Sequence, residues 1–251
     1  MAERSVDTAF ESAPLCRRSP IGDWISIANW TPYVVLYISI PNSQWTRYLV
    51  PYNIQSLMDN LIYEFPSIVE RLDLSTMFLR AQPLQVELGA GDGSFLVQYA
   101  ALHPEFNFIG IERLLGRLRK IDRKGRRAGL TNLRAVRIES AYFLEYLLPR
   151  HSVSALHIYF PDPWPKRKHL RHRLINERFP EVARQALVPQ GVVYLRTDDR
   201  NYFEQMVDVF AGHPEFHQME TPFECAAIVT DFEREFQKKG ITTNRAAYRA
   251  P

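Results

Sequence analysis

Short apolar segments alternate with amphipathic segments from residue 84 onward. Apolar runs of strand length fall at residues 84–88, 106–112, 133–138, 153–160 and 191–197. Segments with helical spacing lie between them, at residues 94–104, 113–130, 141–148 and about 174–187. Strands that alternate with helices predict a parallel sheet with helices on both faces, joined by right-handed crossovers.

A different pattern precedes this region. Apolar residues recur at i, i+3, i+4, i+7 and i+8, namely Ile54, Leu57, Met58, Leu61 and Ile62. This spacing places them on one side of a helix. The pattern therefore predicts that residues 52–79 contain a helix that packs on the core.

Residues 1–50 have no clear helical period and are rich in Pro, Ser, Trp and Tyr. Only residues 33–40, which lie between two prolines, have the apolar character of a strand or buried segment. We therefore expect an irregular N-terminal extension over residues 1–50 and one domain over residues 51–251. The extension either packs on the core or is partly disordered, or it forms an arm that contacts RNA or a partner. If the extension is such an arm, Trp24, Trp30 and Trp45 would be surfaces on which bases stack.

Composition narrows the class of protein. The 251 residues are 46% hydrophobic and 24% charged, values typical of a globular chain. A net charge of +3 neither identifies nor excludes a nucleic-acid binder. The two cysteines, Cys16 and Cys225, are far apart, and no Cys/His cluster has zinc spacing, so neither a disulfide scaffold nor a metal site is expected. An acidic start without an apolar signal region, and no apolar stretch of about 20 residues, predict a cytoplasmic protein without a membrane span.

A glycine-rich loop follows the first apolar run of the predicted sheet. In V-E-L-G-A-G-D-G-S (86–94), glycines such as Gly89 and Gly91 allow a sharp turn and a close approach to a ligand. Glu112 ends the next apolar run, 23 residues after Gly89, where a carboxylate can accept both hydrogen bonds of a ribose diol. Together they predict a nucleoside-containing cofactor.

Two residues in and before this loop distinguish the possible cofactors. The dinucleotide fingerprint needs a third glycine where this chain has Ser94. Glu87, two residues before Gly89, would repel a pyrophosphate but attract the amino-acid ammonium of S-adenosylmethionine. The loop therefore favours S-adenosylmethionine over NAD, and glycines that serve only as turns remain the alternative.

The fourth apolar run leads into the segment F-P-D-P-W-P-K (160–166). In open α/β sheets, ligands bind beyond the carboxyl ends of the strands, which is where this loop lies. A following proline pushes each of Phe160, Asp162 and Trp164 toward extended backbone. A stiff loop that holds one carboxylate and one indole over the cofactor pocket predicts a base-binding platform. The alternative is a rigid turn.

A basic run continues this segment without an acid before Glu177. Its members are Lys166, Arg167, Lys168, His169, Arg171, His172 and Arg173. A charge run is usually a solvated face, but this one adjoins the predicted pocket. Four or five phosphate contacts would give a log–log salt slope of about −3 to −4. The run favours a polyanionic substrate.

These motifs together resemble one known family. The loop VELGAGDG, the GIE segment (110–112) and FPDPWPK with its basic run are similar to the bacterial tRNA (guanine-N7-)-methyltransferases, the TrmB family. The resemblance runs from about residue 83 to the C-terminus. It implies a Rossmann-like class I methyltransferase fold with a mostly parallel seven-stranded sheet, and S-adenosylmethionine as cofactor. It also implies methylation of N7 of a guanosine in the tRNA variable loop, by a monomer or homodimer.

The residues and the resemblance assign a site. Asp162 is the expected catalytic residue, holding guanine through N1 and N2. Cofactor contacts are expected from Glu87, Gly89, Gly91, Glu112, Glu139, Ser140 and Asp162. The resemblance implies substrate contacts from Lys166, Asp198, Thr230, Asp231, Phe232 and Glu233. The chain departs from the family pattern at Glu139, where Asp or Asn is usual, and at Asp231 and Phe232, where the family has Glu and Tyr.

Three other functions compete with this one. Amino-methyltransferases carry (D/N)-P-P-(Y/F/W) after the fourth strand, whereas Trp164 lies between two prolines here. A non-catalytic RNA-binding module with the same fold would not need Glu87, Glu112 and Asp162. A small-molecule methyltransferase would not need the basic run.

Overall fold

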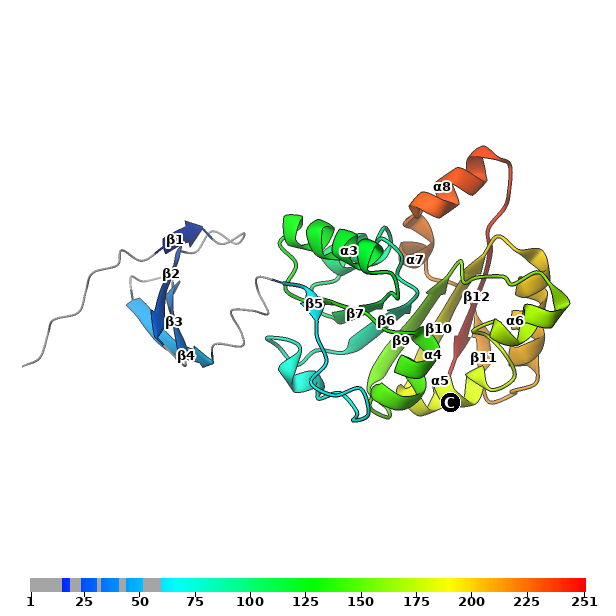
Figure 1. Cartoon of the computed structure of the whole chain (residues 1–251), viewed down its shortest axis with the longest axis horizontal. Helices are drawn as coiled ribbons and strands as arrows, with labels where there is room; N and C mark the ends of the chain where they lie inside the picture. Colours follow the sequence, from blue (N-terminus) through cyan, green and yellow to red (C-terminus); the bar gives the residue numbers. More distant parts are fainter. Residues whose placement is uncertain (1–14, 19–23, 31–32, 41–43, 52–59) are drawn as a thin grey trace, which may run out of the picture. The chain divides into compact units, whose positions relative to one another are not determined.

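The chain divides into two compact units, Met1–Met58 and Asp59–Pro251. The structure is a computed structural model, and it describes residues 15–18, 24–30, 33–40, 44–51 and 60–251. Figure 1 draws the remaining residues as a thin grey trace.

The first unit contains an antiparallel sheet rather than an irregular extension. Its strands β1 (Leu15–Arg18), β2 (Trp24–Trp30), β3 (Tyr33–Ile40) and β4 (Gln44–Pro51) pair in sequence order. The strand predicted at residues 33–40 is confirmed, and the expectation of irregular structure around it was wrong. Its neighbours are also rich in Trp, Tyr, Ile and Val, which suit strands, and short connections join antiparallel partners. The tryptophan side chains invoked for stacking lie outside the described part.

The second unit is built on an eight-stranded sheet with the order β11-β12-β10-β9-β6-β7-β8-β5 (Figure 1). Its strands are β5 (Ile62–Tyr63), β6 (Leu84–Leu88), β7 (Asn107–Ile111), β8 (Leu133–Val136), β9 (Val153–Tyr159), β10 (Leu187–Thr197), β11 (His217–Met219) and β12 (Asn244–Arg249). Only β12 runs against its neighbours. The mostly parallel sheet is confirmed, and β5 adds one strand to the seven expected.

Helices cover both faces of this sheet (Figure 1). They are α2 (Leu96–Leu102), α3 (Leu115–Arg127), α4 (Ser140–Tyr142), α5 (Phe179–Ala186), α6 (Arg200–Ala211), α7 (Phe223–Ala227) and α8 (Asp231–Lys238), with the short helices η1 (Leu74–Thr76), η2 (Phe143–Leu147) and η3 (Arg167–His172). One buried cluster joins the sheet to η2, α5 and α6, and a second joins it to α2, α3 and α7. None of the helices in the described residues is both long and apolar enough to cross a membrane.

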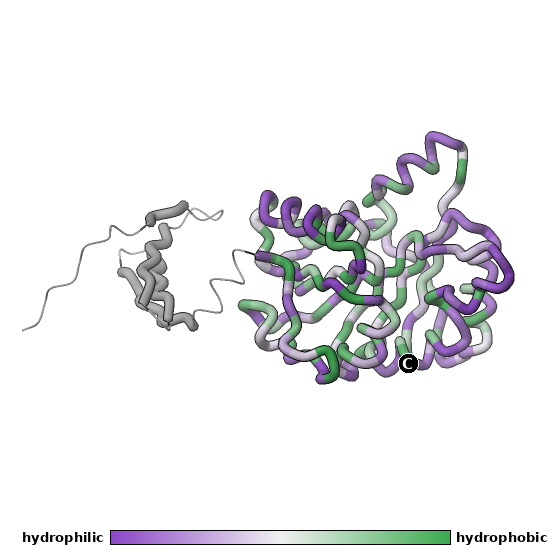
Figure 2. Tube along the Cα trace, viewed as in Figure 1, coloured by the Kyte–Doolittle hydropathy of each residue, from purple (hydrophilic) through white to green (hydrophobic). Residues whose placement is uncertain are grey.

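The central strands are covered on both sides. Every residue of β6, β7 and β8 is buried, and these strands form the hydrophobic centre of the unit in Figure 2. Strands buried on both faces have nearly continuous apolar sequences. This burial leaves the strand ends, and the loops that follow them, as the places where polar chemistry can collect.

The helix expected over residues 52–79 is wrong where the structure can test it. Residues 52–59 lie outside the described part. Ile62 and Tyr63 form β5, which pairs in parallel with Ala135 and Val136 of β8. The carbonyl of Leu61 accepts a hydrogen bond from Ala135, and its amide donates to Asp122 at 2.9 Å. These long-range bonds to β8 and α3 replace the local bonds that a helix would have made.

Candidate active site

The glycine loop after β6 leaves open space beside its first two glycines. Gly89 and Gly91 have φ of +82° and +55°, a conformation that favours glycine. The amides of Gly89 and Ala90 donate to the carbonyl of Ile111 at 2.9 and 2.8 Å, which fixes the turn against β7. A Cβ atom on either glycine would meet no atom within 4 Å, whereas one on Gly93 would lie 3.0 Å from Ile121 of α3. The first part of the loop therefore has room for a ligand, and the last part packs on α3.

Glu87 is a buried carboxylate immediately before this loop. It lies on β6 between Gly110 of β7 and His157 of β9, and it is 3% exposed. Its Oε2 atom has no hydrogen-bond partner. Burial raises the pKa of Glu87 to about 8, although the positive charge of Arg196 opposes the rise. A buried carboxylate with a free oxygen fits a cationic group of a ligand.

Arg196 of β10, to which no sequence motif pointed, is fully buried near Glu87. Its Cζ atom lies 4.3 Å from the ring centroid of Tyr159 and 5.4 Å from that of Phe95. Its Nη1 atom donates to the carbonyl of Ile228 at 2.9 Å. The available signal was a cation inside the apolar run GVVYLRT, because a charge in a buried strand needs nearby partners.

Glu112 follows β7 and is 7% exposed. Its Oε1 atom accepts the amide of Leu114 at 2.7 Å, and Oε2 lies 3.9 Å from Nη1 of Arg117. One oxygen is therefore anchored to the backbone, and the other has only a long contact. This arrangement orients the carboxylate while leaving acceptor capacity for a diol.

Glu139 caps the start of a helix. It is the residue before α4, and its two carboxylate oxygens accept the amides of Ala141 and Tyr142 at 2.9 and 2.7 Å. A carboxylate in this position satisfies amides at the start of a helix. Ser140, the first residue of α4, is half-buried. The adenine contacts expected of both residues stay a prediction.

The loop after β9 is strained at two positions. Phe160 and Trp164 have φ of +52° and +43°, so the extended backbone predicted for them is wrong. Tertiary hydrogen bonds override the effect of the following prolines. The amide of Phe160 donates to the carbonyl of Arg196 at 2.8 Å, and the carbonyl of Pro163 accepts from Nε of Arg173 at 2.7 Å. Non-glycine residues with positive φ cost of order 1–3 kcal/mol each and collect at functional sites.

Arg173 anchors this loop from inside the protein. It is 2% exposed, and besides Pro163 it donates to Gln205 at 2.6 Å and Asn201 at 3.0 Å. Its Cζ atom lies 4.5 Å from the ring centroid of Tyr202. Arg173 is therefore set apart from the basic run that was expected to favour a polyanionic substrate. Lys166, Arg167, Lys168, Arg171 and His172 are exposed, and His169 is half-buried.

Asp162 and Asp198 follow neighbouring strands. Asp162 is exposed in the anchored loop, and its carboxylate makes no hydrogen bond within the described residues. Asp198 comes directly after β10 and is half-buried. It lines a groove of about 530 Å³ together with Phe203, Ile241 and Asn244. The two carboxylates thus lie at the same edge of the sheet.

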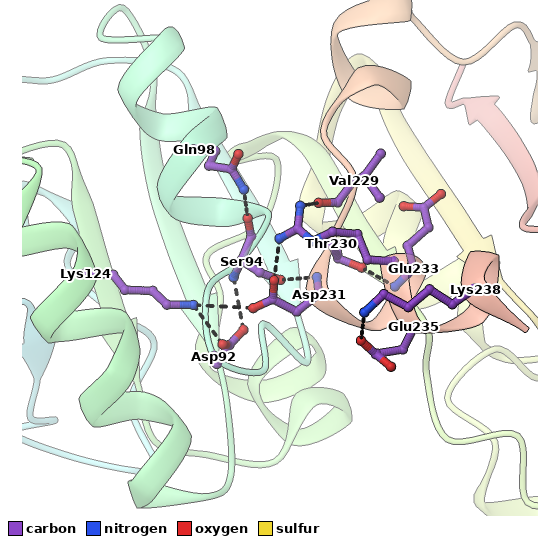
Figure 3. A network of polar contacts seen from close by, with 11 residues as sticks. Asp92, Ser94, Gln98, Lys124, Val229, Thr230, Asp231, Glu233, Glu235 and Lys238 are labelled. Atoms are coloured by element: carbon purple, nitrogen blue, oxygen red, sulfur yellow. Dashed lines mark hydrogen bonds and ion pairs between the residues drawn. The ribbon is translucent and has the colours of Figure 1, made fainter.

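The start of α8 contacts the glycine loop and α3 (Figure 3). Nζ of Lys124 lies 2.7 Å from Oδ2 of Asp92 and 4.0 Å from Oδ2 of Asp231, and the amide of Asp231 donates to the Ser94 hydroxyl at 3.4 Å. Burial raises the pKa of Asp92, but the hydrogen bond and charge of Lys124 outweigh it and leave the pKa below its usual value. Phe232 is half exposed.

Two residues expected to contact substrate face inward instead. Glu233 has no exposed surface, lies 3.4 Å from Nη1 of Arg196 and also binds Arg245. Thr230 is 5% exposed, and its hydroxyl accepts the amide of Glu233 at 3.0 Å. The substrate contacts expected of both side chains stay a prediction. The two side chains hold the start of α8 in place, which positions Asp231 and Phe232.

The sheet order brings the remaining candidates to one edge. Strands β7, β6, β9 and β10 are adjacent and parallel, so their carboxyl ends lie side by side. These ends carry Glu112, Glu87, Asp162 and Asp198 respectively. The chain passes from β6 to β7 and β8 on one side and then crosses from β8 to β9 on the other side of β6. Such a switch point is where open α/β sheets form a ligand crevice.

Comparison with known proteins identifies the family. The family described as "Putative methyltransferase" matches residues 81–246. The tRNA (guanine-N(7)-)-methyltransferase of Chromohalobacter salexigens is 39% identical over 152 residues, which are 61% of this chain and 62% of that protein. The enzymes of the same name from Sodalis glossinidius and Halorhodospira halophila are 35% and 33% identical, over 67% and 71% of this chain and 73% and 79% of those proteins.

Solved structures agree at the level of fold. A 30S ribosomal A1408 methyltransferase from an uncultured bacterium superimposes with a TM-score of 0.52 at 16% identity, over 72% of this chain and 96% of that one. The 16S rRNA methyltransferase KamB gives 0.50 at 18% identity, over 72% and 94%. The sheet is thus that of the class I methyltransferases, and by sequence the chain belongs to the tRNA (guanine-N(7)-)-methyltransferase family.

Proposed function

We propose that this protein transfers a methyl group from S-adenosylmethionine to N7 of a guanosine in the variable loop of tRNA. The observation that carries the proposal is the placement of Asp162. It stands free on a strained loop that Arg173 anchors, beside the strand that ends in the glycine loop. The names of the relatives supply the substrate and the acceptor atom.

The residues at the carboxyl ends of β6 and β7 fit the cofactor. The free Oε2 atom of Glu87 would pair with the amino-acid ammonium, and the open backbone at Gly89 and Gly91 would pass beside it. Glu112 would accept the ribose hydroxyls, and Glu139 and Ser140 would border the adenine. When bound, S-adenosylmethionine supplies an electrophilic methyl group on a sulfonium.

The acceptor atom needs orientation rather than a base. Guanine N7 has a free lone pair and carries no proton, so the protein's task is to hold N7 in line for attack. Asp162 would accept hydrogen bonds from N1 and N2, which selects guanine and fixes its orientation. A carboxylate about 6 Å from the positive charge that develops on the purine is worth roughly 2.8 kcal/mol at an effective dielectric of 20.

Other residues would hold the RNA around this base. Asp198 would contact the base or ribose from the adjacent strand end, and Lys166 would bind a nearby phosphate. Asp231 and Phe232, which α8 presents beside the glycine loop, would border the substrate side. Neither Asp231 nor Phe232 is held in the interior, so both are free to contact RNA.

Replacing Glu112 with alanine tests the cofactor assignment. Loss of hydrogen bonds to a charged acceptor costs about 1.5–3 kcal/mol, so the affinity for S-adenosylmethionine should fall roughly 10- to 150-fold. Calorimetric titration measures this change. Glu105→Ala, which removes an exposed carboxylate after α2, is the control and should bind normally. Equal affinity of the two variants would refute the role of Glu112.

The function itself is tested by methyl transfer from labelled S-adenosylmethionine to unmodified tRNA transcripts, followed by chain cleavage at 7-methylguanosine. Label in the variable loop is the expected result. Label on another nitrogen would support an amino-methyltransferase and overturn the assignment of N7. Binding of S-adenosylmethionine without transfer to any tRNA would overturn the proposed activity.

A further inference from the structure

The solvent-facing side of α3 carries a concentrated positive charge. Residues 113–127 hold eight Lys and Arg and one acid, Asp122. Their net charge of +7 exceeds the net charge of +3 of the whole chain, so the remaining residues are together negative. In Figure 2 this helix is mostly hydrophilic along its length. A field this uneven on a nearly neutral protein directs a polyanion to one surface.

Helical geometry gathers these cations on one face. Leu118, Ile121 and Gly125 are buried against the sheet. At 100° per residue, most lysines and arginines of α3 fall on the side opposite to them, while Arg117 and Lys124 lie toward the flank. Four of them form what we call the α3 basic face: Arg119, Lys120, Arg123 and Arg127. All four are exposed, and within the described residues none forms an ion pair or a side-chain hydrogen bond.

The α3 basic face adjoins the candidate active site. On its flank, Lys124 contacts Asp92 of the glycine loop, and Arg117 lies 5.8 Å from the ring centroid of Phe232 in α8. Along the sheet, β7 leads into α3 and β9 leads into η3, and these strands lie on opposite sides of β6. The end of β6, with its glycine loop, therefore has a basic segment on each side.

We propose that the α3 basic face binds phosphates of the tRNA outside the nucleotide that is methylated. This inference rests on the proposed function, since it takes tRNA as the substrate. Exposed cations without acidic partners gain most from phosphates, because binding releases the counterions of the RNA without breaking an ion pair. Together with the basic residues around η3, the α3 basic face would hold the RNA on both sides of the site while Asp162 holds the base.

The test is the triple variant Arg119→Gln/Arg123→Gln/Arg127→Gln. Glutamine has nearly the helix propensity of arginine, so α3 should persist. Binding of an unmodified tRNA transcript is measured between 50 and 200 mM KCl. Loss of three phosphate contacts should lower the log–log salt slope by about 2–3. Over this range the affinity of the unaltered protein should then fall roughly 16- to 64-fold more than that of the variant.

A matched control separates the α3 basic face from net charge. Arg150→Gln/Arg178→Gln/Arg184→Gln removes three arginines around α5. Arg150 and Arg178 are exposed and Arg184 is half-buried, and Arg178 and Arg184 pair with acids. It should keep the salt slope of the unaltered protein. Both variants should bind S-adenosylmethionine normally, and the α3 variant should show a raised KM for tRNA with kcat retained. Equal salt slopes in the two variants would overturn the inference.

The binding measurement needs no methyl transfer, so the two proposals fail separately. A protein that binds tRNA with a slope reduced only by the α3 variant, yet methylates no guanosine, keeps the α3 basic face and loses the proposed function. A protein that methylates tRNA, but whose two variants have equal salt slopes, keeps the proposed function and loses the α3 basic face. If the unaltered protein shows no salt-dependent binding of tRNA, both are overturned.

Discussion

Replacing Asp162 with alanine is expected to slow methyl transfer by about 10²- to 10³-fold, the range found when one preorganised electrostatic contact is removed from a transition state. The carboxylate is exposed and makes no hydrogen bond within the described residues, so its loss should leave the fold intact. The affinity for S-adenosylmethionine should change only a few-fold, because Glu87 and Glu112 lie on other strands. Single-turnover kinetics and calorimetry measure the two effects.

A second substitution separates the charge of Asp162 from its shape. Asp162→Asn replaces one acceptor oxygen with an NH2 group, which cannot accept from N1 or N2 of guanine, so it should also lose most of the rate. Asp208→Asn, at an exposed position in α6, is the matched control and should be fully active. Near-normal turnover in either Asp162 variant would remove this residue from the mechanism.

Replacing Glu87 with glutamine is expected to stabilise the cofactor-free protein while weakening cofactor binding. Burial raises the pKa of Glu87 to about 8 from an ordinary value of 4.5. The folded protein therefore holds a proton that the unfolded chain releases. This contribution to stability is complete below pH 4.5 and is lost as the pH rises through about 8. Between pH 5 and pH 8 the loss is on the order of 3 kcal/mol.

Glutamine removes this loss because it does not ionise. Urea denaturation at pH 5 and pH 8 should show a smaller fall in the free energy of unfolding for Glu87→Gln than for the unaltered protein. Calorimetry should show affinity for S-adenosylmethionine reduced about 10- to 150-fold, since the charged partner of the ammonium is gone. Glu105→Gln should alter neither result. If Glu87→Gln retained the full pH dependence, another group would be responsible for it.

The sequence predicted the centre of the fold better than its margins. Strands β6 to β10 were predicted from apolar runs, because strands that are buried on both faces are apolar along nearly their whole length. The helix predicted at Leu61–Tyr63 was wrong, because helical spacing in that segment carries no information about the hydrogen bonds available from β8 and Asp122. The local spacing of apolar residues therefore predicts the type of an element only where no residue distant in sequence competes for its backbone hydrogen bonds.

The candidate site divides in the same way. Glu112 and Asp162 were predicted from their positions at or just after the ends of apolar runs, which a parallel sheet brings together. Glu87 was predicted from its position two residues before Gly89. Arg196 and Glu233 form an ion pair that joins β10 to α8 across 37 residues of sequence. No spacing rule predicts such a pair, so the sequence pointed neither to Arg196 nor to the ion pair of Glu233. Their roles follow only from which side chains the fold buries together.

The short strand β5 has a consequence for how the protein is handled. A strand at the border of a sheet presents unpaired N–H and C=O groups, which recruit strands from other molecules and lead to aggregation. β5 occupies that border on β8 through the pairs Ile62–Ala135 and Tyr63–Val136. A shortened chain for expression should therefore start before Leu61. If it starts after Tyr63, β8 becomes an open edge and the catalytic unit becomes prone to self-association.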